Sequence, residues 1–262
     1  GLNMSTGVQN TLIGGGAGDA LTTGSDNVAL GAFALSAANA GSRSVAIGSS
    51  ALNVQNAGSA GQNMYNTAVG YGVGAAMTTG TENTIIGALA GDALTTGTGN
   101  VALGYQALTT EDTAGKNTAI GWRALHTLNA GDVNANNTAV GSDAGLQMTT
   151  GAQNTLVGAG SGDALTTGGF NVAIGYNALS TEDAHGTNIA IGKSALQNLN
   201  AGANAYNVAV GFEAGLSVST GIKNTIIGGL AGDALTTGSE NVAVGYGSLS
   251  TEDGHGKNVA IG

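Results

Sequence analysis

The chain of 262 residues has no cysteine, no proline, few aromatic residues and very little charge. Without cysteine it has neither a disulfide framework nor a thiolate metal site. Without proline, its 48 glycines cannot belong to a collagen triple helix, which needs abundant imino acid. Its apolar runs are only a few residues long, and no charged-then-apolar leader opens the chain. We therefore expect no membrane insertion by this segment.

The balance of charge excludes another class of partner. Six basic residues stand against 16 acidic ones, which gives a formal net charge of -10, and the basic residues do not cluster. Because nucleic-acid binding needs clustered Lys and Arg to neutralise phosphates, we expect no nucleic-acid partner. Hydrophobic residues make up 42% of the chain and charged residues 8%, so there is enough apolar material for a folded core.

The chain does contain a short repeat. A pentad of Asn, a β-branched residue, a small apolar residue, Ile/Leu/Val and Gly occurs fifteen times. Its first residues are Asn10, Asn27, Ser44, Asn66, Asn83, Asn100, Asn117, Asn137, Asn154, Asn171, Asn188, Asn207, Asn224, Asn241 and Asn258. Most pentads start 17 residues apart, while every fourth interval is longer. A period of this length predicts a solenoid in which each repeat is one coil.

The longer intervals define the domain organisation. We expect one repeat array over residues 1–262, built of four-coil modules at approximately 1–65, 66–136, 137–206 and 207–262. A free-standing solenoid needs polar caps on its terminal repeats, and neither end of this sequence offers one. We therefore expect an excerpt of a longer protein.

The pentad predicts a short strand with two dry faces. Its second and fourth residues are β-branched or Leu, and alternation places them on one side of a strand. The residue between them is also apolar, being Ala in eleven coils. A strand that is apolar on both sides needs cover on both sides. We expect the first set to fill the coil's own core and the central residues to face a second chain.

That expectation assigns an oligomer interface, or second buried face, to the central residues. They are Ala29, Ala46, Ala68, Ile85, Ala102, Ala119, Ala139, Leu156, Ala173, Ala190, Ala209, Ile226 and Ala243.

The rest of each coil shows a trade of volumes. Seven coils have Gly eight residues after the pentad start and Leu, Met or Val three residues later, as in Gly18 with Leu21. Other coils have Leu at the first of these positions, as in Leu179, and mostly a small or polar residue at the second. Such compensation is typical of a narrow core of constant packing density. The pentad Gly and the Gly near the coil's end punctuate two turns, and the pentad Asn either forms an amide ladder or satisfies a turn backbone.

The pentads resemble those of a known family. "SVAIG" (44–48), "NVAIG" (171–175 and 258–262) and "NTAIG" (117–121) are similar to the head repeat of YadA-like trimeric autotransporter adhesins, and "NTAVG" arrays occur in bacteriophage tail-fibre proteins. The resemblance covers nearly the whole chain. It implies a trimeric, left-handed parallel β-roll that attaches to a surface. The coils differ from the adhesin head in being mostly 17 residues long with a four-coil superperiod.

The titratable residues do not form a recognisable reaction centre in the sequence. The acidic pairs Glu111-Asp112, Glu182-Asp183 and Glu252-Asp253 recur once per module, as do Asp19, Asp92, Asp163 and Asp233. We interpret all of these as solvated turn residues, because a calcium site needs six to eight converging oxygens. The three His residues have no recurring acid and nucleophile beside them. We predict no catalytic residues, no metal, no cofactor and no enzyme activity.

Aromatic residues gather directly after the pentad Gly. They are Tyr71, Tyr105, Trp122, Tyr176, Phe212 and Tyr246. Rings at such positions stack on sugars or fasten a turn to its neighbour, and we keep both interpretations, glycan stacking being the less common.

The sequence as a whole predicts an all-β, repetitive parallel β-roll or β-solenoid of about fifteen short coils, forming a trimeric fibre. We expect a structural or adhesive shaft of a phage tail fibre or bacterial surface adhesin, extracellular, on a cell surface or on a virion. Its partners would be itself, as a homotrimer or other homo-oligomer, and a cell-surface glycan or protein receptor. The alternatives are a single-chain solenoid that polymerises into an extracellular filament, and a polysaccharide-degrading β-helical tailspike, which needs paired carboxylates in a groove.

Overall fold

The computed structural model describes residues 2–131, 134–182 and 184–262, and divides into two compact units, Gly1–Ala135 and Asn136–Gly262. The strands of the first unit are β1 (Thr11–Ile13), β2 (Val28–Leu30), β3 (Val45–Ile47), β4 (Thr67–Val69), β5 (Thr84–Ile86), β6 (Val101–Leu103) and β7 (Thr118–Ile120). Those of the second are β8 (Thr138–Val140), β9 (Thr155–Val157), β10 (Val172–Ile174), β11 (Ile189–Ile191), β12 (Val208–Val210), β13 (Thr225–Ile227), β14 (Val242–Val244) and β15 (Val259–Ile261).

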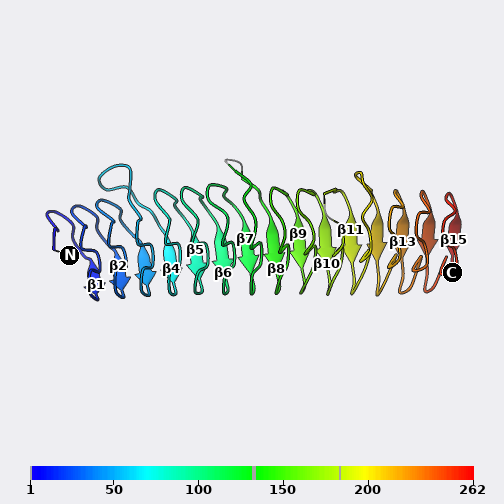
Figure 1. The fold of residues 1–262 in the computed structure, drawn as a ribbon, viewed down its shortest axis with the longest axis horizontal. Helices are drawn as coiled ribbons and strands as arrows, with labels where there is room; N and C mark the ends of the chain where they lie inside the picture. Colours follow the sequence, from blue (N-terminus) through cyan, green and yellow to red (C-terminus); the bar gives the residue numbers. More distant parts are fainter. Residues whose placement is uncertain (1, 132–133, 183) are drawn as a thin grey trace. The chain divides into compact units, whose positions relative to one another are not determined.

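Within each unit the strands form a parallel β-solenoid. Each strand pairs with the strand of the next coil, and equivalent residues face each other, as in Ala29 with Ala46 and Ala173 with Ala190. Figure 1 shows the arrows of neighbouring coils side by side and pointing the same way. Every strand begins directly after the first residue of a pentad, so the predicted strands and the solenoid class are confirmed. No helix within the described ranges is long and apolar enough to cross a bilayer.

The core lies on the side of the central strand residue, which corrects the predicted orientation of the strand. In β2 to β14 this residue is fully buried within the single chain, and the first and third residues are never buried. The expectation that a second chain covers the central residues is therefore wrong. Two apolar sets alternate along the strand, and the smaller set faces inward because the coil's interior is narrow. The corrected residues are Ala29, Ala46, Ala68, Ile85, Ala102, Ala119, Ala139, Leu156, Ala173, Ala190, Ala209, Ile226 and Ala243.

The predicted compensation of side-chain volumes in the core is confirmed. It also involves a third position, the central residue of the strand. A Cβ atom added at Gly162 would lie 2.8 Å from side-chain carbons of both Leu156 and Leu165. Gly162 therefore makes room for a large central strand residue as well as for the Leu three positions later. Seven coils with a central Ala have Leu in place of this Gly, and Ala173 and Leu179, which belong to one such coil, are both fully buried. Different coils thus fill the core with large side chains at different positions.

The pentad glycine is required by the stacking of coils. Gly31 has φ +136°, and a Cβ atom there would lie 2.5 Å from the carbonyl oxygen of Gly48 in the next coil. A side chain would be strained by the backbone conformation and would overlap neighbouring backbone. This explains why all fifteen pentads end in Gly.

The pentad asparagines perform both roles expected of them. Asn83 Oδ1 accepts a hydrogen bond from the backbone N–H of Asn100, at 2.9 Å, and Asn83 Nδ2 donates to the carbonyl of Gly97, at 2.9 Å. The same pair of bonds repeats at Asn154, with Asn171 and Gly168. A ladder of buried amides therefore fixes the start of each strand to the next coil and to the turn that ends its own coil.

Gln55 repairs this ladder where Ser44 interrupts it. The Gln55 side chain is fully buried. Its Nε2 donates to Ser44 Oγ at 2.9 Å, and its Oε1 accepts from Asn66 Nδ2 at 2.9 Å. Gln55 stands eleven residues after Ser44, where most other coils have Leu or Met, so a regular core position of this coil supplies the missing amide.

Candidate interaction surfaces

The first and third residues of each strand form an uncharged surface, which we call the outer strand face. All of them are Thr, Val, Ile or Leu. Leu103 is 41% exposed and Ile227 is 40% exposed. Because the central residues fill the core, nothing in the coil itself covers this face. Within each unit, a band of partly exposed Val, Ile and Leu side chains, interspersed with Thr, is typical of an interaction site.

Aromatic residues flank the strands at both ends. The six expected after the pentad Gly are all exposed, from 45% at Trp122 to 77% at Tyr246. Four more exposed rings were missed. Tyr65, Phe170 and Tyr206 stand directly before a pentad, and Phe33 lies two residues after one. The first three share one repeat position, directly before a pentad, which was the available signal.

Several of these rings contact cations. The guanidinium of Arg123 lies 3.8 Å from the centroid of Trp122, and Lys193 Nζ lies 4.8 Å from that of Phe212. Cation–π contacts of this kind fix a ring on a surface. The interpretation that aromatic residues fasten neighbouring turns therefore fits Phe212, whose cation comes from the preceding coil.

Glu111 is buried, contrary to the expectation of a solvated turn residue. Its Oε1 accepts from the backbone N–H of Ala114 at 2.7 Å, and its Oε2 accepts from that of Ala130 at 3.2 Å. Ala130 belongs to the lengthened coil that follows. Burial raises the pKa of the Glu111 carboxyl above its ordinary value, although these hydrogen bonds favour the charged form.

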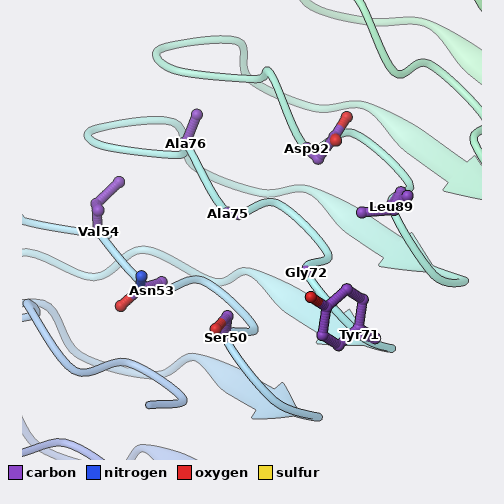
Figure 2. Close-up of a pocket in the computed structure, with 9 residues that line it drawn as sticks. All are labelled: Ser50, Asn53, Val54, Tyr71, Gly72, Ala75, Ala76, Leu89 and Asp92. Atoms are coloured by element: carbon purple, nitrogen blue, oxygen red, sulfur yellow. The ribbon is translucent and has the colours of Figure 1, made fainter.

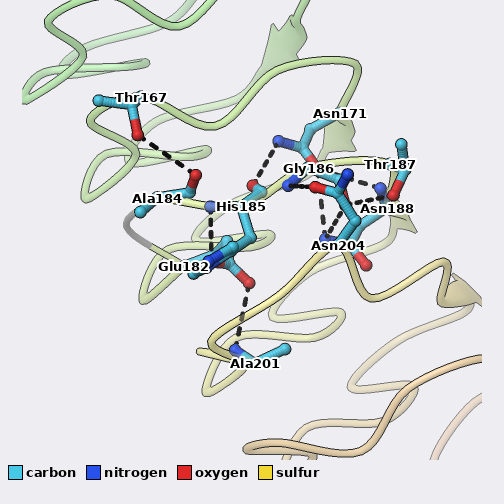
Figure 3. Close-up of polar contacts among 10 residues, drawn as sticks. All are labelled: Thr167, Asn171, Glu182, Ala184, His185, Gly186, Thr187, Asn188, Ala201 and Asn204. Carbon is cyan, nitrogen blue, oxygen red and sulfur yellow. Dashed lines mark hydrogen bonds and ion pairs between the residues drawn. The ribbon is translucent and has the colours of Figure 1, made fainter.

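Glu182 repeats this arrangement in the second unit and corrects the same expectation. Its side chain is fully buried and its Oε2 accepts from the N–H of Ala201, at 3.5 Å, in the next lengthened coil. Figure 3 shows it between Ala201 and His185, whose N–H donates to Oε1 at 3.2 Å. The neighbouring Asp183 lies outside the described residues. The sequence predicted solvent-exposed carboxylates at Glu111 and Glu182. In the structure, residues of the following lengthened coil cover both side chains.

Glu252 occupies the same repeat position but remains partly exposed. The backbone N–H and Nδ1 of His255 lie 2.9 and 2.8 Å from its Oε1. The hydrogen bond from the backbone of His255, followed by that from its ring, lowers the pKa of Glu252, while Glu252 raises the pKa of His255. Glu252, Asp253 and His255 bring one donor atom each within 4.8 Å of one another. Hydrogen bonds join Glu252 and His255 within this group.

The second acidic series is also less solvated than expected. Asp92, Asp163 and Asp233 are partly buried, and in each of them Oδ1 is shielded from water without a hydrogen-bond partner. Burial raises the pKa of Asp92 and of Asp163.

Asp92 also lines an open hollow in the first unit. The hollow has a volume of about 630 Å³ and lies over the coil of β4, between the coils of β3 and β5. Figure 2 shows Asn53 and Val54 on one side, Leu89 and Asp92 on the other, and the ring of Tyr71 at the end of β4.

Comparison with known proteins adds no relative. No family model, no curated protein and no solved structure matches this chain.

Proposed function

We propose that this chain is a structural segment of a fibre that associates with further copies of itself through the outer strand face. The observation that supports this is the composition of that face. Its thirty side chains include no charged residue and are all at least partly exposed. A regular, uncharged band of partly exposed Thr, Val, Ile and Leu side chains is a candidate for burial by a partner.

The regularity of the face favours another copy as the partner. Strands of neighbouring coils lie roughly 4.8 Å apart, so the apolar side chains repeat at that interval within each unit. A partner that buries the whole band needs the same interval, and a second copy of the chain has it. Most soluble oligomers are symmetric assemblies of identical chains. The homotrimer remains our specific proposal, on the resemblance to trimeric adhesin heads.

Charged residues flank the outer strand face in the first unit. In the first unit the residues directly before the pentads include Asp26, Arg43, Glu82 and Lys116, in alternating sign. Arg43 Nε lies 3.6 Å from Asp26 Oδ2 within the chain, and both side chains are exposed. Because this pair is formed within one chain and is exposed, it joins neighbouring coils weakly.

The role that follows is passive. Stacked coils would hold an attachment region away from its base on a cell surface or virion, in a phage tail fibre or a surface adhesin. The tailspike alternative requires two carboxylates that face each other across a groove. The hollow of the first unit is lined by one, Asp92.

The test is the solution mass of the full chain, measured by light scattering. We expect a multiple of 25.1 kDa, with three copies as the specific expectation. Ile227→Lys, on the outer strand face, should return the mass to one copy while leaving the far-ultraviolet circular dichroism unchanged. Thr181→Lys, at an exposed position away from the strands, is the matched control and should not change the mass.

A wild-type mass of one copy would overturn self-association through this face. A multimer that Ile227→Lys leaves intact would place the interface elsewhere, as in end-to-end polymerisation of single chains.

A further inference from the structure

The hollow of the first unit exists because one coil departs from the repeat. At three positions that line the hollow, the coil of β4 has Gly72, Ala75 and Ala76. The equivalent coils of the next two modules have larger side chains there. They are Asp143, Leu146 and Gln147 in one, and Glu213, Leu216 and Ser217 in the other. The hollow is therefore a local change in an otherwise repeating surface.

The backbone did not force the small residues. Gly72 has φ +60°, and its equivalents Asp143 and Glu213 adopt φ 57° and 53°. A larger side chain is thus compatible with this turn, as the other two modules demonstrate. The space over β4 is a property of these three residues, and filling it would require only side chains that the same chain uses elsewhere.

We propose that this hollow binds a neutral saccharide. This inference does not depend on self-association. The Tyr71 ring is 64% exposed and stands at one end of the hollow, where its flat face can stack on a sugar ring. A volume of about 630 Å³ is within the range of small-molecule sites and larger than one monosaccharide needs.

The polar groups around the hollow include hydrogen-bond donors and acceptors, and a sugar hydroxyl can pair with both. Ser36 Oγ donates a hydrogen bond to Asn53 Oδ1, which orients the amide so that Nδ2 is left as a donor. On the other side Asp92 supplies a carboxylate, which accepts from hydroxyls. The Ser50 hydroxyl can do either. A hydroxyl-rich ring is the ligand class that uses donors and acceptors together with an apolar face.

The charges of the lining exclude acidic ligands. No Lys, Arg or His lines the hollow, and its one charged group is Asp92. A phosphate, sulfate or sugar acid would meet a like charge without a compensating cation. An organic ammonium would also suit Tyr71 and Asp92, so it must be distinguished by experiment.

The experiment screens the labelled full chain on an array of immobilised neutral glycans, then titrates the best free oligosaccharide calorimetrically. We expect binding with a Kd near 1 mM or tighter, and at least tenfold weaker binding by Tyr71→Ala. The double variant Ala75→Leu/Ala76→Gln copies Leu146 and Gln147, so it should fold normally and also lose at least tenfold in affinity. Tyr105→Ala, which removes an exposed ring away from the hollow, should bind as the wild type does.

Three results would overturn the proposal. One is the absence of binding to any neutral glycan on the array. Another is undiminished binding by the double variant when its circular dichroism is unchanged. The last is tetramethylammonium binding that is tighter than the best saccharide and sensitive to Tyr71→Ala.

Discussion

Glu111 Oε2 accepts a hydrogen bond from the backbone N–H of Ala130, 3.2 Å away and in the following coil. This contact ties a buried carboxylate to the extra residues of a lengthened coil. Glu252, at the same position of its own repeat, is partly exposed. The two residues therefore have pKa values shifted in opposite directions, raised in Glu111 and lowered in Glu252.

The raised pKa of Glu111 predicts a specific dependence of stability on pH. Between the ordinary pKa of 4.5 and the raised folded value, the folded state binds more protons than the unfolded state. The contribution of Glu111 is therefore fully present below the ordinary pKa and is lost as pH rises through the folded value. Relative to Glu111→Gln, the free energy of unfolding of the wild type should fall across this window, measured by urea denaturation.

Glu252→Gln is the control, because the pKa of Glu252 is shifted in the opposite direction. The folded pKa of Glu252 is lowered, so its contribution is present above the ordinary value and is lost as pH falls through the folded value. Identical pH profiles for the two variants would contradict the burial of Glu111.

Loss of Gln55 should leave a gap in the amide ladder. Gln55→Ala removes the partners of the Ser44 hydroxyl and of one Asn66 Nδ2 bond, all of them buried. Leaving such groups unpaired costs roughly 1–3 kcal/mol. Chemical denaturation of this variant and of Gln147→Ala, an exposed Gln, should show a loss for the first and a change within about 0.5 kcal/mol for the second. Equal stabilities would mean that Gln55 does not support the ladder.

Gly104→Ala should destabilise the first unit strongly. Gly104 has φ +139°, and a Cβ atom there would overlap the carbonyl oxygen of Gly121. Strain and displaced backbone together should cost about 2 kcal/mol or more. Gly15→Ala is the control, since nothing lies within 4 Å of its added Cβ. Thermal melting that does not distinguish the two variants would contradict the close approach of the coils.

The exchange of volumes in the core predicts a rescue. Ala173→Leu should cost about 1–3 kcal/mol by overfilling the coil that also holds Leu179. Adding Leu179→Gly reproduces the Leu156 and Gly162 pair of the preceding coil, and should restore part of the stability. A double-mutant cycle by urea denaturation measures this coupling. Purely additive losses would show that the two positions do not share one space.

Several features followed from the sequence because each has a local cause. The pentad located all fifteen strands, since Asn, an apolar triplet and Gly mark a turn, a strand and a turn. The prediction of which strand face points into the core was wrong. The central residues and the flanking strand residues are both largely apolar, so alternation alone does not distinguish the inner face from the outer one. The small size of Ala29 and its equivalents was the relevant signal, since it indicates a narrow core as readily as a close partner.

Other features depend on contacts that the spacing does not reveal. The burial of Glu111 and Glu182 requires the lengthened coil to fold over the turn before it. That both residues precede a lengthened coil was visible, but the type of residue suggested solvent. The hollow beside Tyr71 likewise arises from residues of three coils, and only a comparison of the modules position by position would have indicated it.

Between coils, the backbone hydrogen bonds join immediate neighbours, about 17 residues apart in the sequence. A stack held together in this way has no single nucleus on which all of it depends. Damage at one coil would weaken its two junctions and leave more distant coils nearly unaffected. Under load or heat, such a unit should open by fraying at an end or by separating at its weakest junction, and the remaining pieces would keep their structure.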